Sequence, residues 1–217
     1  MKEMSLEAFA SETASSSPAP GGGSVAALSG ALAASLVEMA ANLTIKSKKY
    51  TAVHKEMDGL RAKALGLRLQ LLDDIQRDTD SFNTYMDAVH LPKGTEEEIQ
   101  SRRAAMQAAL RGAALVPLGV AKNALEILSL CKEVVLHGNA AVITDSLSAA
   151  LTARSAALAA LLNVKINLGA MQNQEEVQAI SLQVRQLEEK IPIVEKEILD
   201  LAPDDLKILP VASNENP

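Results

Sequence analysis

A single aspartate, Asp78, has the sequence position expected of a proton-transfer group. At helical spacing it projects with apolar residues, whereas Asp73, Asp80 and Asp87 share a polar face and are interpreted as a solvated line. A carboxylate on an apolar face must be paired or have its pKa raised by desolvation. Perturbed carboxylates of this kind carry general acid and base chemistry. The alternative is a structural ion pair or a cap for another helix.

A second set of polar residues follows the long Ala-rich segment 25–46. At about 100° per residue, its members lie within about 40° of one line. They are Ser24, Ser35, Glu38, Asn42, Lys46 and Lys49. Since apolar residues cover nearly all of the remaining circumference, we expect this line to face a wet internal cleft or a subunit interface rather than bulk water.

A third polar line lies on segment 140–171 and comprises Asp145, Thr152, Asn163 and Asn167. Asn163 and Asn167 are one helical turn apart, so their amides offer paired donors and acceptors on one face. Such amides can read the edge of a heterocycle or orient a water molecule. The alternative is a polar network between packed helices, because buried amides require partners in any case.

The stretch 15–24 contains two prolines and three consecutive glycines, which do not propagate regular structure. It predicts a bent loop that enters a helix with Ser24 as the N-cap. Gly21, Gly22 and Gly23 lack a Cβ, so backbone N–H groups there can approach a ligand closely. The first turn of the helix then offers an anion site for a phosphate, a carboxylate or an oxyanion. The alternative is simply a tight entry into a helix.

Helical periodicity runs through most of the chain, and no alternating strand pattern persists. The sequence predicts an all-α, up-and-down bundle of long Ala-rich helices, with one domain over 1–201 and a flexible tail over 202–217. Thr95 and Glu98 form a capping box. The helical segments expected are 6–13, 24–46, 51–89, 95–136 (kinked or split at Pro117), 140–171 and 174–199 (interrupted at Pro192).

Composition narrows the possible partners and compartments. The 217 residues carry a formal net charge of −6 and show no basic face, which argues against nucleic acid. The Ala-rich stretches contain too many polar residues for a bilayer span, and no secretory signal pattern opens the sequence. One cysteine, Cys131, excludes an intrachain disulfide and is typical of a reducing cytoplasm. Apolar surface around most of several helices predicts a homodimer.

Three histidines, His54, His90 and His137, lie at expected helix ends or exposed positions without ligand spacing. We interpret them as surface or capping residues, and we expect no metal site.

Several short motifs occur in an order that resembles a known family. They are Pro20-Gly-Gly-Gly-Ser24, Lys49-Tyr50, Asp78-x-x-x-Phe82, Leu91-Pro-Lys93, Val116-Pro-Leu118, Thr144-Asp145 and Asn163-Val-Lys-Ile-Asn167-Leu. Together they resemble the cyclodeaminase domain of formiminotransferase-cyclodeaminase and its free-standing bacterial relatives, which include methenyltetrahydrofolate cyclohydrolases. The resemblance extends over roughly residues 5–199.

The resemblance implies a multihelical, intertwined dimer that acts on a tetrahydrofolate bearing a one-carbon unit, without a metal or redox cofactor. We expect hydrolysis of 5,10-methenyltetrahydrofolate to 10-formyltetrahydrofolate, because this sequence contains no formiminotransferase segment. The alternative is ring closure of formiminotetrahydrofolate with release of ammonia. A further alternative is a non-catalytic helical dimer that binds folate.

On this hypothesis Asp78 or Asp145 transfers the proton, and Lys46 or Lys49 lowers a carboxylate pKa or pairs with the folate glutamate tail. The turn Gly21 to Ser24 holds a carboxylate, and Asn163 with Asn167 orients the pterin or the attacking water. The hypothesis requires that Asn42, Lys46, Asp78, Asp145 and Asn163 converge on one cleft, which the second subunit completes.

Overall fold

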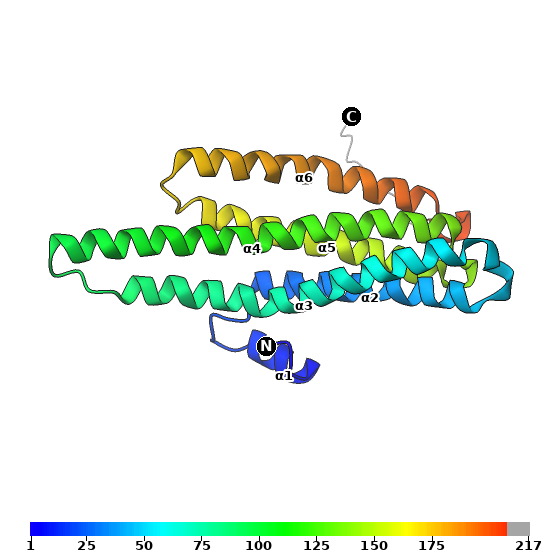
Figure 1. Cartoon of the computed structure of the whole chain (residues 1–217), viewed down its shortest axis with the longest axis horizontal. Coiled ribbons are helices and arrows are strands. Elements are labelled where there is room, and N and C mark those ends of the chain that lie inside the picture. Colours follow the sequence, from blue (N-terminus) through cyan, green and yellow to red (C-terminus); the bar gives the residue numbers. More distant parts are fainter. Residues whose placement is uncertain (208–217) are drawn as a thin grey trace, which may run out of the picture.

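The computed structural model describes residues 1–207, and within them the chain is built from helices and turns with no strand (Figure 1). This confirms the all-α prediction. The α-helices are α1 (Leu6–Thr13), α2 (Gly22–Lys46), α3 (His54–His90), α4 (Glu96–His137), α5 (Ile143–Leu168) and α6 (Gln174–Asp200). Short 3₁₀ turns are η1 (Lys48–Val53), η2 (Ala140–Val142) and η3 (Asp204–Leu206).

Side chains cap the N-termini of three of the six α-helices, α1, α4 and α6. Ser5 accepts a hydrogen bond from the Ala8 amide, and Asn173 accepts from the amides of Glu175 and Glu176. At Thr95 both bonds of the predicted capping box are present. Ser24 is different: α2 begins two residues earlier, at Gly22, with Gly21 as an N-cap that makes no side-chain bond. The hydroxyl predicted to cap this helix is therefore available for another partner.

The predicted interruption at Pro192 is wrong, and at Pro117 the chain is not split, because α6 and α4 each continue through their proline. A proline inside a helix removes one backbone hydrogen bond and costs about 3 kcal/mol or more. Pro117 is buried, and helix packing extends for several turns on both sides of it. Local propensity is thus overridden by tertiary packing.

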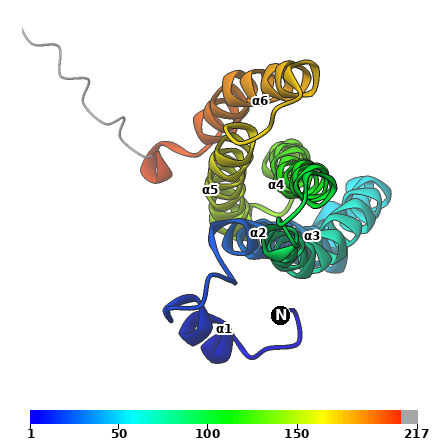
Figure 2. The ribbon, with the colours of Figure 1, turned by 90° about the vertical axis from the view of Figure 1, so that its left-hand side faces the viewer.

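Helices α2 to α5 run up and down, and α6 lies over α4 and α5 (Figure 1). The end-on view shows α2 between α5 and α3, with α4 above α2 and between the same two helices (Figure 2). Alanines on α2 and α5 are fully buried, and Gly30 is so close to α3 that an added Cβ would lie 3.1 Å from Leu71 Cδ1. Small residues therefore allow the close approach of α2 to its neighbours.

Helices α3 and α4 extend past the start of α2 and the end of α5 (Figure 1). At the C-terminal side, Ala202 is buried and η3 follows it. The remainder of the predicted tail, 208–217, lies outside the described residues.

Three helical stretches are long and apolar enough to cross a membrane when only length and composition are considered: Gly22–Lys46, Glu96–His137 and Ala140–Leu168. The sequence interpretation that such stretches are too polar to span is therefore not supported by composition. Half or more of the residues in each apolar window are nevertheless buried inside this fold.

Candidate active site

A cavity of about 500 Å³ lies where α2 begins and α5 ends, against the extended part of α3 and α4. Its volume falls in the range of small-molecule sites. The residues lining it are Pro18, Ala19, Gly21, Gly22, Gly23, Asp78, Thr79, Phe82, Tyr85, Leu110, Ala113, Asn163, Ile166, Asn167 and Ala170. Asp78 and the polar line on α5, through Asn163 and Asn167, thus contribute to one cavity, whereas the polar line on α2 does not.

Asp78 is the charged side chain among these lining residues, and it is half-buried on α3. Its Oδ2 accepts a hydrogen bond of 2.8 Å from Ser24 Oγ. Burial raises the pKa of Asp78 above its ordinary value, and hydrogen bonds from the Ser24 hydroxyl and backbone amide partly offset that rise. A carboxyl group of this kind exchanges a proton more readily near neutral pH than an exposed aspartate does.

The glycine-rich turn makes room for this carboxylate. A Cβ added to Gly23 would lie 2.1 Å from Asp78 Oδ1, and one added to Gly22 would lie 3.2 Å from Asn163 Nδ2. The sequence predicted an anion at the start of this helix, and in the structure the side chain there is the protein's own Asp78. The absence of a Cβ at Gly23 is therefore a requirement of the site and not only of the chain's entry into α2.

Asn163 and Asn167 both line the cavity, but their amide nitrogens are already engaged. Asn163 Nδ2 donates to the carbonyl of Ala159, and Asn167 Nδ2 donates to the carbonyls of Ala113 and Asn163. These bonds fix the two side chains on α5 and leave their amide oxygens as acceptors. The cavity can therefore accept hydrogen bonds from N–H groups of a ligand, and Asn163 retains one N–H as a donor.

Sequence reasoning missed the apolar and aromatic walls of the cavity. Phe82 and Tyr85 come from α3, Leu110 and Ala113 from α4. The sequence did contain a signal for this aromatic wall. Phe82 and Tyr85 follow Asp78 by one and two helical turns, in a chain with only two phenylalanines and two tyrosines. Aromatic rings next to amide acceptors suit a flat heterocycle.

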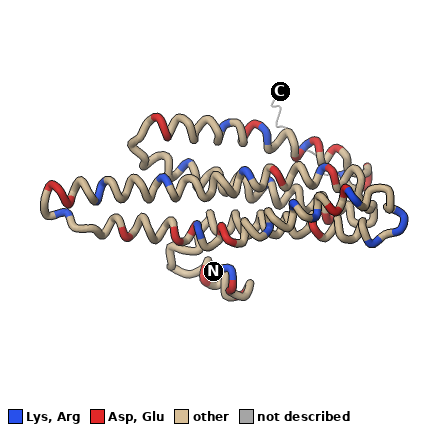
Figure 3. The backbone as a smooth tube through the Cα atoms, viewed as in Figure 1, with Lys and Arg blue, Asp and Glu red and all other residues tan. Residues whose placement is uncertain are grey.

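The remaining predicted site residues lie at the other end of the bundle. Since α2 and α5 are antiparallel and rise about 1.5 Å per residue, Asp145 lies about 27 Å along α5 from Asn163. Lys46 ends α2, about 33 Å from Ser24, and Lys49 follows in η1, where its ammonium lies 5.5 Å from the centre of the Tyr50 ring. In Figure 3 this basic turn occupies the right-hand end.

A single chain therefore brings Asp78, Ser24, Asn163 and the glycines together but does not bring Asn42, Lys46, Lys49 or Asp145 to them. Within one chain, therefore, these residues do not converge on one cleft, and the prediction that a second subunit completes the cleft stays a prediction. Angular position on a helix was read from the sequence correctly, but position along the bundle depends on which helix ends meet.

The polar line on α2 faces α3 rather than a wide cleft. Ser24 is buried against Asp78 and Thr79, and Glu38 Oε2 pairs with Arg68 Nε at 2.9 Å. No member of the line itself lines the cavity, and Ser24 is connected to it only through the hydrogen bond to Asp78. The outer surface of α2 is apolar instead.

A second buried carboxylate, Asp74, was not singled out by the sequence analysis. Its Oδ1 pairs with Arg77 Nη1 at 2.5 Å, while its Oδ2 is buried without a hydrogen-bond partner among the described residues. Burial raises the pKa of Asp74, and the Arg77 charge opposes that rise. Asp74 does not line the cavity, so we assign it no chemical role.

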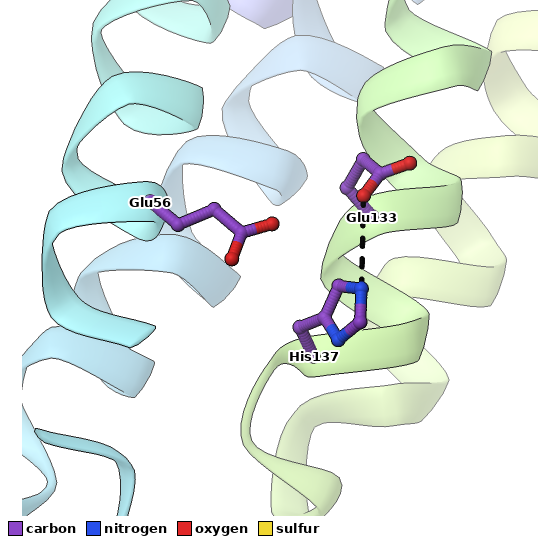
Figure 4. A group of neighbouring side chains, drawn as sticks. All are labelled: Glu56, Glu133 and His137. Atoms are coloured by element: carbon purple, nitrogen blue, oxygen red, sulfur yellow. Dashed lines mark ion pairs between the residues drawn. The ribbon is translucent and has the colours of Figure 1, made fainter. Parts of the chain in front are cut away.

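A further group of ionisable side chains joins α3 to α4 far from the cavity (Figure 4). Ligand atoms of Glu56, Glu133 and His137 lie within 4.8 Å of one another, and His137 Nε2 is 3.8 Å from Glu133 Oε2. The sequence interpretation placed His137 at a helix end without ligand spacing, and tertiary structure adds Glu56 to it. Two of the three side chains are exposed, and an ion pair one helical turn long accounts for the His137 contact.

Comparison with known proteins shows the family to which this chain belongs. A sequence profile described as Formiminotransferase-cyclodeaminase matches residues 5–186. The chain belongs to the formiminotransferase-cyclodeaminase family. This confirms the resemblance drawn from the motifs and identifies the protein as a relative of enzymes that act on substituted tetrahydrofolates.

Individual relatives of this family member differ in activity. It is 42% identical over 162 residues to the methenyltetrahydrofolate cyclohydrolase of Methylorubrum extorquens, covering 75% of this chain and 78% of that protein. It is 34% identical to the formimidoyltransferase-cyclodeaminase of Rattus norvegicus over 76% of this chain, which spans only 31% of the rat protein. The formiminotetrahydrofolate cyclodeaminase of Thermotoga maritima superposes with a TM-score of 0.84 at 28% identity, covering 92% of this chain and 96% of that one.

Proposed function

We propose that this family member hydrolyses 5,10-methenyltetrahydrofolate to 10-formyltetrahydrofolate. The observation that supports this most directly is Asp78, a half-buried carboxylate of raised pKa in the wall of a cavity that is large enough for a pterin. The 42% identity to a methenyltetrahydrofolate cyclohydrolase over most of both chains favours this substrate.

The cavity walls suit the pterin of such a substrate. The ring packs against Phe82 and Tyr85, and its N–H groups donate to the amide oxygens of Asn163 and Asn167. This arrangement directs the one-carbon bridge towards Asp78. Positioning of this kind lowers the barrier because water, carboxylate and reacting carbon no longer need to find one another in solution.

The proposed reaction adds water to the carbon between N5 and N10. Ionised Asp78 accepts a proton as the water oxygen bonds to this carbon, and protonated Asp78 then donates that proton to N5 as the carbon–N5 bond breaks. The hydroxyl proton of the intermediate leaves to solvent, and its oxygen becomes the formyl oxygen on N10. Every step is a proton transfer or a carbon–nitrogen or carbon–oxygen bond change, so we propose that the reaction requires no metal or redox cofactor.

Cyclodeamination is the second candidate function, favoured by the likeness to the Thermotoga maritima enzyme over nearly its whole length. In that reaction N10 attacks the formimino carbon on N5 and gives its proton to ionised Asp78, which then donates that proton to the formimino nitrogen as its bond to the carbon breaks and ammonia leaves. The same cavity serves both reactions, because each passes through a tetrahedral carbon between two nitrogens. A folate-binding dimer without catalysis is the remaining candidate.

An assay with purified protein distinguishes these candidates. With 5,10-methenyltetrahydrofolate, the near-ultraviolet band of the substrate should disappear faster than in buffer alone. With formiminotetrahydrofolate, appearance of that band together with free ammonia would replace our proposal with cyclodeamination. Tight binding of either compound without turnover would leave only the binding function.

We further propose that the chain acts as a cytoplasmic homodimer that neither enters a membrane nor binds nucleic acid. The net charge of −6 supports the absence of nucleic-acid binding, and the buried, free Cys131 supports a reducing compartment. Burial of half or more of each long apolar window inside the fold supports the expectation that the chain does not enter a membrane. Exposed leucine and isoleucine side chains on α5 support a protein partner.

A further inference from the structure

A second, smaller cavity of about 200 Å³ lies along the first turns of α4. The residues lining it are Ile99, Arg102, Arg103, Met106, Gln107 and Gln172. Among these there are two arginines and no carboxylate, whereas the charged side chain that lines the larger cavity is the acidic Asp78. The two cavities therefore differ in the sign of their charge.

Both cavities use the same face of α4. At about 100° per residue, Arg103 and Leu110 lie within about 20° of one line along the helix. The same holds for Met106 and Ala113, and both Leu110 and Ala113 line the larger cavity. Arg103 comes seven residues before Leu110, so about 10 Å separates them along the helix axis. The face that lines the larger cavity thus continues to the arginines.

Gln107 connects the two cavities through the turn between α5 and α6. Its Nε2 donates a hydrogen bond of 3.2 Å to the carbonyl of Ala170, which lines the larger cavity. Its Oε1 accepts a hydrogen bond of 2.7 Å from the amide of Gln172, which lines the smaller one. These two bonds hold the turn against α4, so the cavities are neighbouring parts of one surface.

The two arginines have hydrogen-bond donors to spare. Neither forms an ion pair with any residue of 1–207, unlike the arginines at positions 61, 68, 77, 111 and 154. Arg102 Nε donates a hydrogen bond of 2.9 Å to the carbonyl of Val89 on α3, which fixes the side chain and leaves its terminal nitrogens as donors. The carboxylate one helical turn before Arg102, that of Glu98, is used on backbone amides of the capping turn. The smaller cavity therefore offers two guanidinium groups to an external anion.

The proposed substrate carries such an anion. A folate joins its pterin through a p-aminobenzoyl group to a glutamate with two carboxylates, and the described lining of the larger cavity contains no cation for them. We infer that Arg102 and Arg103 bind the glutamate carboxylates of a folate whose pterin occupies the larger cavity. This inference rests on the proposed function for the identity of the ligand. Guanidinium groups suit the role because their planar donors match the geometry of a carboxylate.

The arginines replace the lysines to which the sequence analysis assigned the glutamate tail. In the same chain Lys46 ends α2, about 33 Å along the helix from Ser24, where the larger cavity begins. The arginines lie about 10 Å along α4 from that cavity's wall. The p-aminobenzoyl group is a rigid spacer, and Met106 lies on the path it would take between the two cavities. A tail that leaves the larger cavity along α4 therefore meets the arginines.

Titration calorimetry under anaerobic conditions tests the assignment without reference to turnover. The probes are tetrahydrofolate and tetrahydropteroate, which has the same pterin and p-aminobenzoyl group but no glutamate. The wild type should bind tetrahydrofolate about tenfold more tightly, because the carboxylates form charge-assisted hydrogen bonds. Arg103→Gln, which leaves the bond between Arg102 and Val89 intact, should lower this preference by about fivefold. Arg185→Gln is the matched control, since Arg185 is exposed on α6 and lines neither cavity, and it should keep the wild-type preference.

Steady-state kinetics separates binding of the tail from an effect on the chemistry. Carboxylates held equally in the ground state and the transition state contribute to KM, so Arg103→Gln should raise KM for 5,10-methenyltetrahydrofolate by about fivefold rather than lower kcat. A fall in kcat at the wild-type KM would show that Arg103 acts on the position of the reacting groups. That result would overturn its assignment as a ligand of the tail.

Failure of this inference and failure of the proposed function give different results. Equal affinity of the wild type for the two probes, or an unchanged preference in Arg103→Gln, would overturn the inference while turnover still reports on the proposed function. Loss of the preference in Lys46→Gln, with Arg103→Gln unaffected, would return the tail to the lysine and also overturn it. A preference that depends on Arg103 in a protein without turnover would refute the proposed hydrolysis and support the tail site.

Discussion

Substitution of Gly23 by alanine is the sharpest single test of the candidate active site. The added Cβ would lie 2.1 Å from Asp78 Oδ1, 2.6 Å from Cγ and 2.7 Å from Oδ2. These atoms are at the end of a rotatable side chain, so the carboxylate must turn away and its 2.8 Å bond with Ser24 Oγ must break. The change therefore acts on the position of Asp78 without touching the residue itself.

The expected effects on stability and activity differ. Loss of a hydrogen bond to a charged group costs about 1.5–3 kcal/mol, while replacing a helical glycine with alanine contributes about 0.8–1 kcal/mol in the other direction. The net loss of about 1–2 kcal/mol corresponds to a fall in Tm of about 2–8 °C for a domain of this size. Removal of a positioned general acid or base costs about 10²–10⁴-fold, so kcat should fall by at least about 100-fold.

Gly59 and Gly66 on α3 provide matched controls, because a Cβ added at either meets nothing within 4 Å. Gly59→Ala and Gly66→Ala should raise Tm by about 2–4 °C and leave kcat unchanged. Circular dichroism melts and steady-state turnover of 5,10-methenyltetrahydrofolate measure both quantities. Full activity in Gly23→Ala, with the protein folded, would refute the placement of Asp78 as the proton-transfer group.

Three further outcomes are expected. Asp78→Asn should lose turnover but gain stability relative to wild type as pH rises. The pKa of Asp78 in the folded protein is raised above the ordinary 3.8, so the carboxyl group's contribution to folding stability is fully present below pH 3.8. That contribution is lost in the wild type as pH rises through the folded-state pKa. Melts between pH 4 and 8 measure this, and a wild type that gains stability over the variant across that range contradicts it. Asn167→Ala leaves the carbonyls of Ala113 and Asn163 without their amide donor, and denaturant unfolding should show that the free energy of unfolding falls by about 1–3 kcal/mol. The control Asn42→Ala should lower it by less than about 0.5 kcal/mol. Equal losses in the two variants would show that these bonds are not stabilising. Burial raises the pKa of Cys131 to about 12, so a thiol reagent should label it only in denaturant, and rapid labelling of the native protein would contradict its burial.

The sequence by itself determined the helices and the faces of their residues. Helical periodicity and caps such as Thr95 with Glu98 are local, so they predicted most helix bounds to within a few residues and placed Asp78 on an apolar face. The prolines were the local exception. Pro117 and Pro192 predict breaks by their own chemistry, but packing along many turns keeps both helices continuous.

Only the tertiary structure decided which polar residues meet. Asp78 and Asn163 share a cavity because α3 passes the start of α2 where α5 ends, whereas Asp145 lies on the same face of α5 as Asn163 but about 27 Å away. Periodicity reports the angle of a side chain around its helix axis and carries no information about the position of one helix along another. That position is set by packing between residues distant in sequence, such as Gly23 against Asp78.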